Sequence, residues 1–231
     1  MPLQTNKYKL YLYLFFFIFL TSIFNFKILD NYQEKFSLKK IYIYGLSNNE
    51  KQSIEIELNK LRNINIFKLT EDRVLKTLKK FNFLENIYVN KIIPSTININ
   101  LSKTLIIGKT LRNGEYFYIG KNGNFIKSNQ LNETINIPSV FGEFRIEEYI
   151  DLQNILSENE VDLQNIEKYF YYKNKRWDLL FSNKSTLMLP SQNVVKSIKI
   201  YKKLLDSDNI LNKKIIDLRI TNQIILTNYN E

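Results

Sequence analysis

The residue types that most often carry chemistry in proteins are scarce in this sequence of 231 residues, which contains no His and no Cys. Without His, the chain lacks the commonest general base and the commonest metal ligand. Without Cys, it has no thiol nucleophile and no disulfide. Zinc sites, His-based triads and thiol chemistry are therefore excluded, and the remaining candidates for catalysis are carboxylates.

Two pairs of neighbouring acids could in principle act together. Glu147 and Glu148 are adjacent in a segment with helical spacing, where successive side chains point about 100° apart, so we expect both to be solvated. Asp206 and Asp208 follow the expected end of a later helix, and we expect them to cap the turn there. Neither pair has the convergent geometry that general acid–base catalysis requires.

The remaining candidates also favour a structural interpretation. Asp178 and Asp217 are single acids in predicted strands, and we expect ion pairing, with Arg219 as a candidate partner. The segment Gly120–Gly123 predicts a hairpin and no phosphate loop, because no helix and no Lys-Ser/Thr pair follows it. Trp177 is predicted to anchor the core. We therefore predict no catalytic, cofactor-binding or metal-binding residue, and no small-molecule substrate.

The sequence instead points to binding through its last predicted strand, residues 224–227. No later strand follows in the chain, so this strand is expected at a sheet edge, with unpaired N–H and C=O groups. Such an edge can accept a strand from another protein by β-augmentation. The alternative is that residues 228–231 cover the edge, but this segment is short for that purpose.

An apolar and aromatic stretch near the N-terminus predicts a membrane anchor. Residues 10–26 make a helix of roughly 25 Å at ~1.5 Å per residue, and including residues 27–29 brings it close to the ~30 Å hydrocarbon core. A cleaved signal peptide is the alternative. The chain contains no Ala for an A-x-A cleavage site, so we predict an uncleaved transmembrane helix over residues 10–29.

Charge indicates the orientation of this anchor. Lys7 and Lys9 precede the span without an acid among them, which favours a cytoplasmic N-terminal tail, residues 1–9, and extracytoplasmic domains after the span. Residues 1–112 carry 18 Lys+Arg against 8 Asp+Glu, whereas residues 113–231 carry 15 of each. The basic half is compatible with anionic membrane lipid or with compositional bias alone, and the compartment disfavours nucleic acid.

The segment after the anchor shows the pattern of a small α+β domain, expected over residues 36–104. A β-rich run, residues 36–44, ends at Gly45, and Ser47 with Glu50 has the spacing of a capping box that starts a helix to about Leu61. Thr70 is expected to cap a second helix. Two strands follow, residues 87–93 and 96–101, and the second alternates apolar and polar residues strictly.

This order of strand, helix, helix, strand, strand resembles a POTRA domain. The resemblance rests on the strand that ends at Gly45, the two helices and the hairpin whose second strand reads Pro94-x-Thr96-Ile97-x-Ile99-x-Leu101. POTRA domains generally act as docking platforms for other polypeptides. The resemblance therefore implies a binding domain and no enzyme.

Residues 105–228 predict a second, β-rich domain with a few helices. Its helices are expected near residues 146–156 and 194–205. A turn is expected at Arg112-Asn113-Gly114, and Asn122-Gly123 is the strongest hairpin signal. The predicted strands are residues 106–110, 116–119, 124–127, 166–172, 177–181, 186–189, 215–220 and 224–227.

The whole chain, in order, resembles the FtsQ/DivIB family of bitopic cell-division proteins. The second domain carries Gly120-x-x-Gly123, then Ile137-Pro138-x-x-x-Gly142, Trp177-Asp178-Leu179 with Leu187-x-Leu189-Pro190, and finally Ile216-Asp217-Leu218-Arg219. The last motif is the most specific, because the family closes with a V-D-L-R strand. The chain departs from the family at Gly120, where Asp is common, and at Ser102–Leu105, where Glu-Arg-x-Pro is usual.

The resemblance implies a non-enzymatic divisome scaffold in the cytoplasmic (inner) membrane at the division septum, linking early division proteins to septal wall synthesis. Its partners would be FtsB- and FtsL-like bitopic proteins, with other divisome proteins on the POTRA-like domain. A POTRA-bearing transport or outer-membrane assembly factor is the alternative; it would need several POTRA repeats, and the sequence shows one. The implied partner-binding residues are Arg176, Ile220, Asn222, Gln223, Ile224, Ile225, Leu226 and Thr227.

Overall fold

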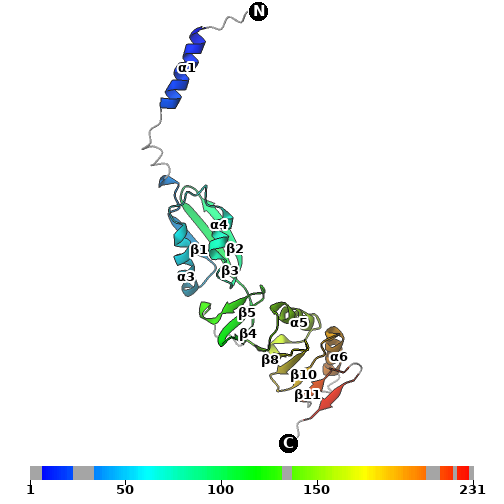
Figure 1. The fold of residues 1–231 in the computed structure, drawn as a ribbon. Helices are drawn as coiled ribbons and strands as arrows, with labels where there is room; N and C mark the ends of the chain where they lie inside the picture. Colours follow the sequence, from blue (N-terminus) through cyan, green and yellow to red (C-terminus); the bar gives the residue numbers. More distant parts are fainter. Residues whose placement is uncertain (1–6, 23–33, 132–136, 207–213, 221–222, 229–231) are drawn as a thin grey trace, which may run out of the picture.

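The computed structural model describes residues 7–22, 34–131, 137–206, 214–220 and 223–228. Figure 1 shows helix α1 (Lys7–Ser22) at one end of an elongated molecule, followed by a first α/β domain and then a larger sheet with two helices. The α+β class predicted from the sequence is confirmed. Helix α1 begins three residues before the predicted span, and residues 23–29 of that span lie outside the described residues. No helix within the described residues is long and apolar enough to cross a membrane.

The first domain has the predicted order of elements. It comprises strand β1 (Lys40–Tyr44), helix α3 (Asn48–Leu58), a 3-10 turn η1 (Asn59–Leu61), helix α4 (Glu71–Leu78), and strands β2 (Leu84–Ile92) and β3 (Thr96–Lys103). The three strands form a sheet in the order β1-β3-β2, with β1 parallel and β2 antiparallel to β3. Strand β1 is shorter than predicted, and the segment before it makes a single bridge between Ser37 and Asn65.

Local sequence signals explain both helices of this domain. The Ser47 amide and hydroxyl donate to Glu50 Oε2 at 2.9 and 2.7 Å, as the capping-box spacing predicts. Thr70 Oγ1 accepts a hydrogen bond from the Arg73 amide at 3.3 Å. The apolar faces of α3 and α4 are buried in one hydrophobic cluster with the alternating apolar residues of β3. The buried side chains include Ile54, Leu58, Val74, Leu78, Ile97, Ile99 and Leu101.

Gly45 is required where β1 ends. Its φ is +89°, a left-handed conformation, and a Cβ there would lie 2.0 Å from the Leu101 carbonyl oxygen. Any side chain would therefore clash with the backbone of β3. This contact explains why the β-rich run ends at a glycine.

The second domain is built on a nine-stranded sheet in the order β12-β11-β10-β9-β8-β7-β4-β5-β6. Three neighbouring pairs are parallel: β4 with β7, β7 with β8, and β10 with β11. From the sequence we predicted antiparallel hairpins, so these parallel pairs were not expected, and strand β7 was not predicted at all. The strands are β4 (Ile106–Arg112), β5 (Glu115–Gly120), β6 (Phe125–Lys127), β7 (Ser139–Phe141), β8 (Ile166–Tyr171), β9 (Trp177–Phe181), β10 (Thr186–Met188), β11 (Ile215–Asp217) and β12 (Ile225–Thr227).

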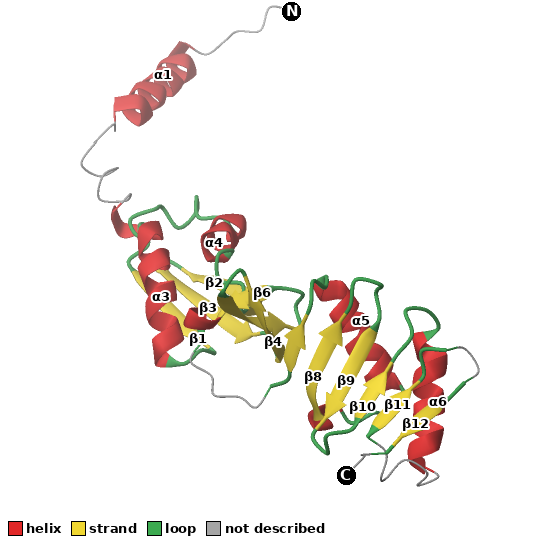
Figure 2. Ribbon diagram, turned by 60° about the horizontal axis from the view of Figure 1, so that its bottom comes forward, coloured by secondary structure: helices red, strands yellow, loops and turns green. Residues whose placement is uncertain are grey.

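Helices α5 (Ile146–Glu158) and α6 (Val194–Asp206) cover one face of the strands β8 to β11 (Figure 2). Trp177 is 5% exposed and lies in this core, as predicted. The core also holds a polar network in which Gln153 Nε2 donates to the hydroxyl oxygens of Tyr149 and Tyr169 at 2.8 Å each. Burial raises the pKa of both tyrosines, so they stay neutral.

The two domains share packing across the predicted boundary at residues 104–105. Four side chains of the second domain, Ile106, Ile126, Leu131 and Ile137, belong to the hydrophobic cluster of the first. Asn122, in the β5–β6 turn, donates from Nδ2 to the carbonyl oxygens of Asn82 and Leu84 at 3.0 and 3.2 Å. These two hydrogen bonds hold the β5–β6 hairpin against the first domain.

Candidate functional site: an open sheet edge and its charged face

Strand β12 lies at one edge of the nine-stranded sheet, with β11 as its hydrogen-bonding neighbour. Its side chains alternate as the pleat requires. Leu226 is half-buried and packs on the core below α6, whereas Ile225 is 44% exposed and points to the other side. The predicted position of this strand at a sheet edge agrees with the structure.

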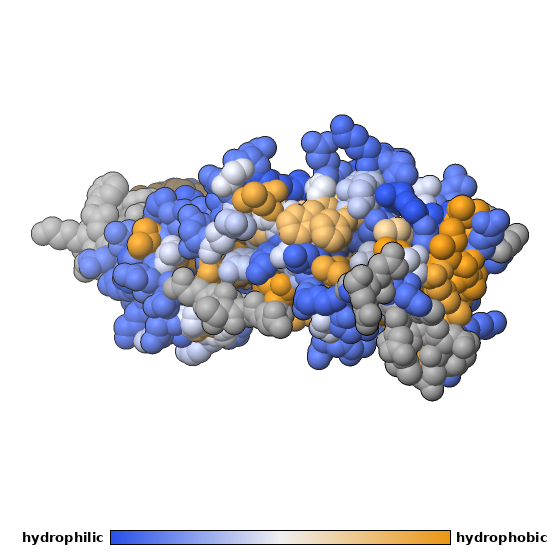
Figure 3. Space-filling view, turned by 90° about the horizontal axis from the view of Figure 1, so that it is seen from below, coloured by the Kyte–Doolittle hydropathy of each residue, from blue (hydrophilic) through white to orange (hydrophobic). Residues whose placement is uncertain are grey.

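The other predicted partner-binding residues fall into two places. Ile220 and Ile224 are 51% and 45% exposed and flank the turn before β12, where the Gln223 amide donates to the Ile220 carbonyl oxygen at 3.2 Å. Thr227 is also exposed, and Asn222 lies outside the described residues. Arg176 lies elsewhere, in the turn between β8 and β9. Figure 3 shows an apolar patch at the end of the molecule formed by the C-terminal elements.

The face of the sheet opposite α5 and α6 carries a row of side chains that leads to this edge. The strand register aligns Asp178 with Met188, Met188 with Asp217, and Asp217 with Ile225. Two acids that are far apart in the sequence therefore stand in one row across four strands. Both are buried, with Asp178 4% and Asp217 8% exposed.

Asp217 is held by Arg219, as the sequence predicted. The Arg219 amide and Nε donate to Asp217 Oδ1 at 3.0 and 2.8 Å, and Nη2 donates to Oδ2 at 2.5 Å. These hydrogen bonds hold the pKa of the Asp217 carboxyl below its usual value, in spite of burial. The motif Ile216-Asp217-Leu218-Arg219 thus places two apolar residues in the core and a paired acid and base on the open face.

Asp178 is paired more loosely. Its Oδ2 lies 3.9 Å from Arg176 Nη2, and the Tyr172 hydroxyl hydrogen-bonds the same carboxylate. Burial outweighs these contacts and raises the pKa of Asp178. Within the described residues, neither Asp178 Oδ1 nor Arg176 Nε has a hydrogen-bond partner, although both atoms are buried.

Arg176 is positioned by stacking as well as by charge. Its guanidinium lies 4.3 Å from the centre of the Tyr172 ring, and the Tyr172 amide donates to the Arg176 carbonyl oxygen at 3.0 Å. Asp217 and Arg219 also feel the charges of Arg176 and Asp178, respectively. The four charged residues therefore form one network on this face of the sheet, from the start of β9 to the end of β11. No feature of the sequence indicated the links between the two pairs.

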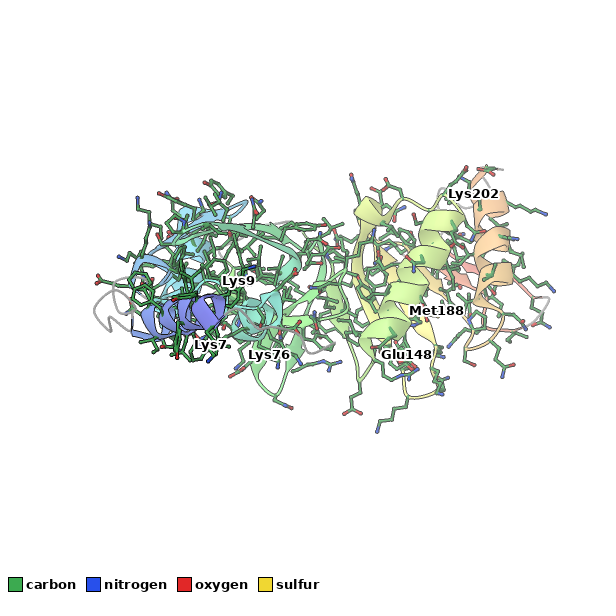
Figure 4. The ribbon with its side chains drawn as sticks, turned by 90° about the horizontal axis from the view of Figure 1, so that it is seen from above. Lys7, Lys9, Lys76, Glu148, Met188 and Lys202 are labelled. Carbon is green, nitrogen blue, oxygen red and sulfur yellow. The ribbon has the colours of Figure 1, made fainter. Side chains whose placement is uncertain are left out.

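The predicted solvation of the carboxylate pair on α5 is right for Glu147 and wrong for Glu148. Glu148 stands in the first turn of α5 (Figure 4), where its Oε2 accepts from the Arg145 amide at 3.0 Å. It also hydrogen-bonds Tyr171, and the pKa of Glu148 is lowered because these donors outweigh its desolvation. Glu148 is therefore a helix cap. Asp206 is the last residue of α6, and Asp208 lies outside the described residues.

Known families match both domains. Residues 36–103 match the POTRA domain of FtsQ type, and residues 110–219 match the C-terminal family of cell division proteins FtsQ/DivIB. The chain is also similar to cell division protein FtsQ of Rickettsia bellii (strain RML369-C), with 26% identity over 196 residues, which cover 84% of this chain and 73% of the relative. FtsQ of Rhizobium radiobacter is 21% identical over 178 residues, covering 74% of this chain and 85% of the relative.

Among solved structures, the major extracytoplasmic domain of DivIB from Geobacillus stearothermophilus has a TM-score of 0.34 and 13% identity. It covers 47% of this chain and 98% of that one.

A POTRA domain joined to a β-rich domain defines the class of two-domain proteins to which this fold belongs. Within that class, the order of the two matched domains and the similarity to several FtsQ proteins decide the family. The chain belongs to the FtsQ/DivIB family, and its function lies in cell division.

Proposed function

We propose that this protein is a non-enzymatic, membrane-anchored scaffold of the divisome that captures FtsB- and FtsL-like bitopic proteins along strand β12. The POTRA domain would receive other divisome proteins. The observation that carries the proposal is the place of β12 at the edge of the nine-stranded sheet, with Ile225 exposed on this strand and Ile224 exposed just before it. An added strand would gain affinity from main-chain hydrogen bonds and specificity from alternate side chains.

The two arginines of the charged network support capture of a partner with acidic residues. Asp217 and Arg219 stand on the same face of the sheet as Ile225, and Arg219 is 37% exposed at its side chain. The Arg176 side chain is 22% exposed, and a guanidinium can donate to a carboxylate. We therefore assign Arg176 and Arg219 to orienting the partner, and Ile224 and Ile225 to packing against it.

The proposed location is the cytoplasmic membrane, with residues 1–9 in the cytoplasm, residues 10–29 as the span and both domains outside at the septum. Helix α1 supports this proposal because its residues are apolar on all sides, and residues 10–20 are all exposed. A helix without a polar face has no surface that favours water. Lys7 and Lys9 at its start supply the basic flank expected on the cytoplasmic side.

Two proline substitutions test the edge. Consecutive residues of a strand direct their N–H groups to opposite sides, so one of Ile225→Pro and Leu226→Pro removes an N–H that points away from β11. That variant should melt like the parent and lose capture of co-expressed FtsB- and FtsL-like proteins, measured by co-purification with the full chain. If both variants fold and still capture the partners fully, β12 is not the docking strand.

A matched pair of lysine substitutions separates docking from general surface effects. Ile225→Lys places a charge on the edge strand, whereas Leu111→Lys places one on β4, where the parent residue is similarly exposed at 53%. Only the first should reduce co-purification. Leu226→Lys points into the core and should lower the melting temperature instead. Equal capture by the first two variants would contradict the proposal.

A further inference from the structure

The end of the POTRA domain at which the chain enters from α1 has an unusual surface, which we call the entry surface. It consists of residues 34–40, the loop of residues 62–68 and the tip between β2 and β3, residues 91–95. The backbone ties the three segments together: the Lys39 and Lys40 amides donate to the Ser95 carbonyl oxygen, and the Ile66 amide donates to that of Phe36. Figure 1 shows this end of the domain directed towards α1.

Large apolar side chains project from the entry surface. Phe67 is 61% exposed, Ile92 44% and Ile93 59%. The centre of the Phe67 ring lies 5.3 Å from that of Phe36, and Phe36 is half-buried against the core. Phe67 is therefore exposed on its outer side and packed on its inner side. Phe67 and Ile93 lie in connecting segments outside the strands. Their exposure is therefore not explained by the alternation of side chains along a strand.

Basic residues share these three segments with the apolar side chains. The three segments contain six Lys and Arg residues and a single acid, Glu34. Glu34 lies 3.8 Å from Lys39, whereas Lys40, Lys68 and Lys91 make no ion pair with any described residue. Arg62 is fixed in place, because its Nη1 donates to the Lys39 carbonyl oxygen at 2.6 Å. A surface that combines exposed apolar side chains with several cations suits a membrane interface with anionic lipids.

We propose that the entry surface docks on the anionic phospholipid surface of the membrane, with Phe67 and Ile93 at headgroup depth and the lysines on lipid phosphates. The inference rests on the proposed anchor. If the span ends at residue 29, five residue steps separate it from Glu34, which allows at most about 18 Å. The tether therefore holds this surface within reach of the bilayer, and lipid is favoured over an acidic protein as its occupant.

The absence of Cys from the chain makes a probe experiment direct. Single-cysteine variants Phe67→Cys and Ile93→Cys of the full chain carry an environment-sensitive fluorophore and are reconstituted into vesicles of phosphatidylcholine with or without phosphatidylglycerol. Both probes should shift to blue emission and be quenched by a headgroup-depth lipid quencher when phosphatidylglycerol is present. Leu111→Cys, on an equally exposed residue of β4, should show neither change.

Charge substitutions then test the electrostatic part. Replacing Lys40, Lys68 and Lys91 by Gln should lower the equilibrium constant for contact of the entry surface with phosphatidylglycerol vesicles by roughly fivefold for each charge removed. The proposal is overturned if the Phe67 and Ile93 probes stay as polar as the Leu111 probe, or respond equally on both vesicle types, while the chain floats with the vesicles. Failure of the chain to float at high salt would instead contradict the proposed anchor, so the two failures are distinguishable.

Discussion

Two neighbouring aspartates of the open sheet face have opposite electrostatic environments. Asp217 receives three hydrogen bonds from Arg219, and its pKa is lowered by them. Asp178 is equally buried, but Arg176 is 3.9 Å away, and desolvation raises its pKa. Distance to the guanidinium therefore decides which effect dominates. The acid and the base are two residues apart in both cases, with each acid in a strand and each base just outside it. This spacing predicts that they share a face, but it does not predict the difference in pKa.

The two aspartates should respond oppositely to neutralisation. Asp217→Asn should destabilise the protein by about 1 kcal/mol at neutral pH, because it removes a carboxylate that the folded state favours. A lowered folded-state pKa gives stability above the unfolded value of about 3.8 that is lost as the pH falls through the folded value. The deficit of this variant should therefore shrink in acid, as measured by thermal melts across pH.

Asp178→Asn should instead have a free energy of unfolding at neutral pH that equals that of the parent or exceeds it by about 1 kcal/mol. A raised folded-state pKa means that stability is lost as the pH rises through the unfolded and then the folded value, and the amide avoids this loss. In acid, where Asp178 is protonated in the parent, the advantage should disappear. Equal destabilisation of both variants at neutral pH would show that the two environments do not differ as described.

At the scale of elements, the first domain could be predicted well because its signals are local. The capping box at Ser47, the cap at Thr70 and the strict alternation of β3 each act within a few residues and agree with the structure. The signal for the turn at Arg112-Asn113-Gly114 was also local. The turn joins β4 to β5, and Asn113 and Gly114 adopt the positive φ of a tight hairpin.

The second domain was less predictable because its sheet order depends on contacts between distant segments. Strand β7 has only three residues, and one of them is buried. It pairs in parallel with β4 and β8, so no hairpin turn in the sequence indicates its presence. The edge position predicted for β12 agrees with the order of the described strands, but the neighbours of Asp178 and Asp217 could not be predicted. Their alignment exists only after β9, β10 and β11 come together.

The joint between the domains is also set by long-range contacts, and Asn122 is its main polar link. Asn122→Ala removes both hydrogen bonds from its amide and leaves the carbonyl oxygens of Asn82 and Leu84 without those partners. We expect a loss of about 1–2 kcal/mol in the free energy of unfolding, measured with urea. Asn124→Ala, in the same turn and exposed, is the control and should behave as the parent. Equal midpoints for the two variants would show that the link adds nothing.

At the scale of the molecule, the basic half and the apolar helix lie at the same end. Residues 1–112 carry the whole charge excess, and the proposed scaffold places them nearest to the membrane. Residues 113–231, which carry no net charge, contain strand β12, and this strand lies at the end of the molecule far from α1. This division would separate attraction to anionic lipid from recognition of protein partners, because exposed charges separated by more than about 10 Å are screened at 0.1 M salt.

This arrangement depends on the orientation of the chain in the membrane, which can be measured with two substituted cysteines. Tyr8→Cys lies at the start of α1 and Tyr116→Cys on β5, where the parent residues are 85% and 64% exposed. Because basic flanks stay in the cytoplasm, a membrane-impermeant maleimide added to intact spheroplasts should label Tyr116→Cys and reach Tyr8→Cys only after lysis. The parent chain, without Cys, should stay unlabelled and serves as the control. Labelling of Tyr8→Cys from outside, with Tyr116→Cys protected, would invert the proposed topology and place β12 out of reach of any extracytoplasmic partner.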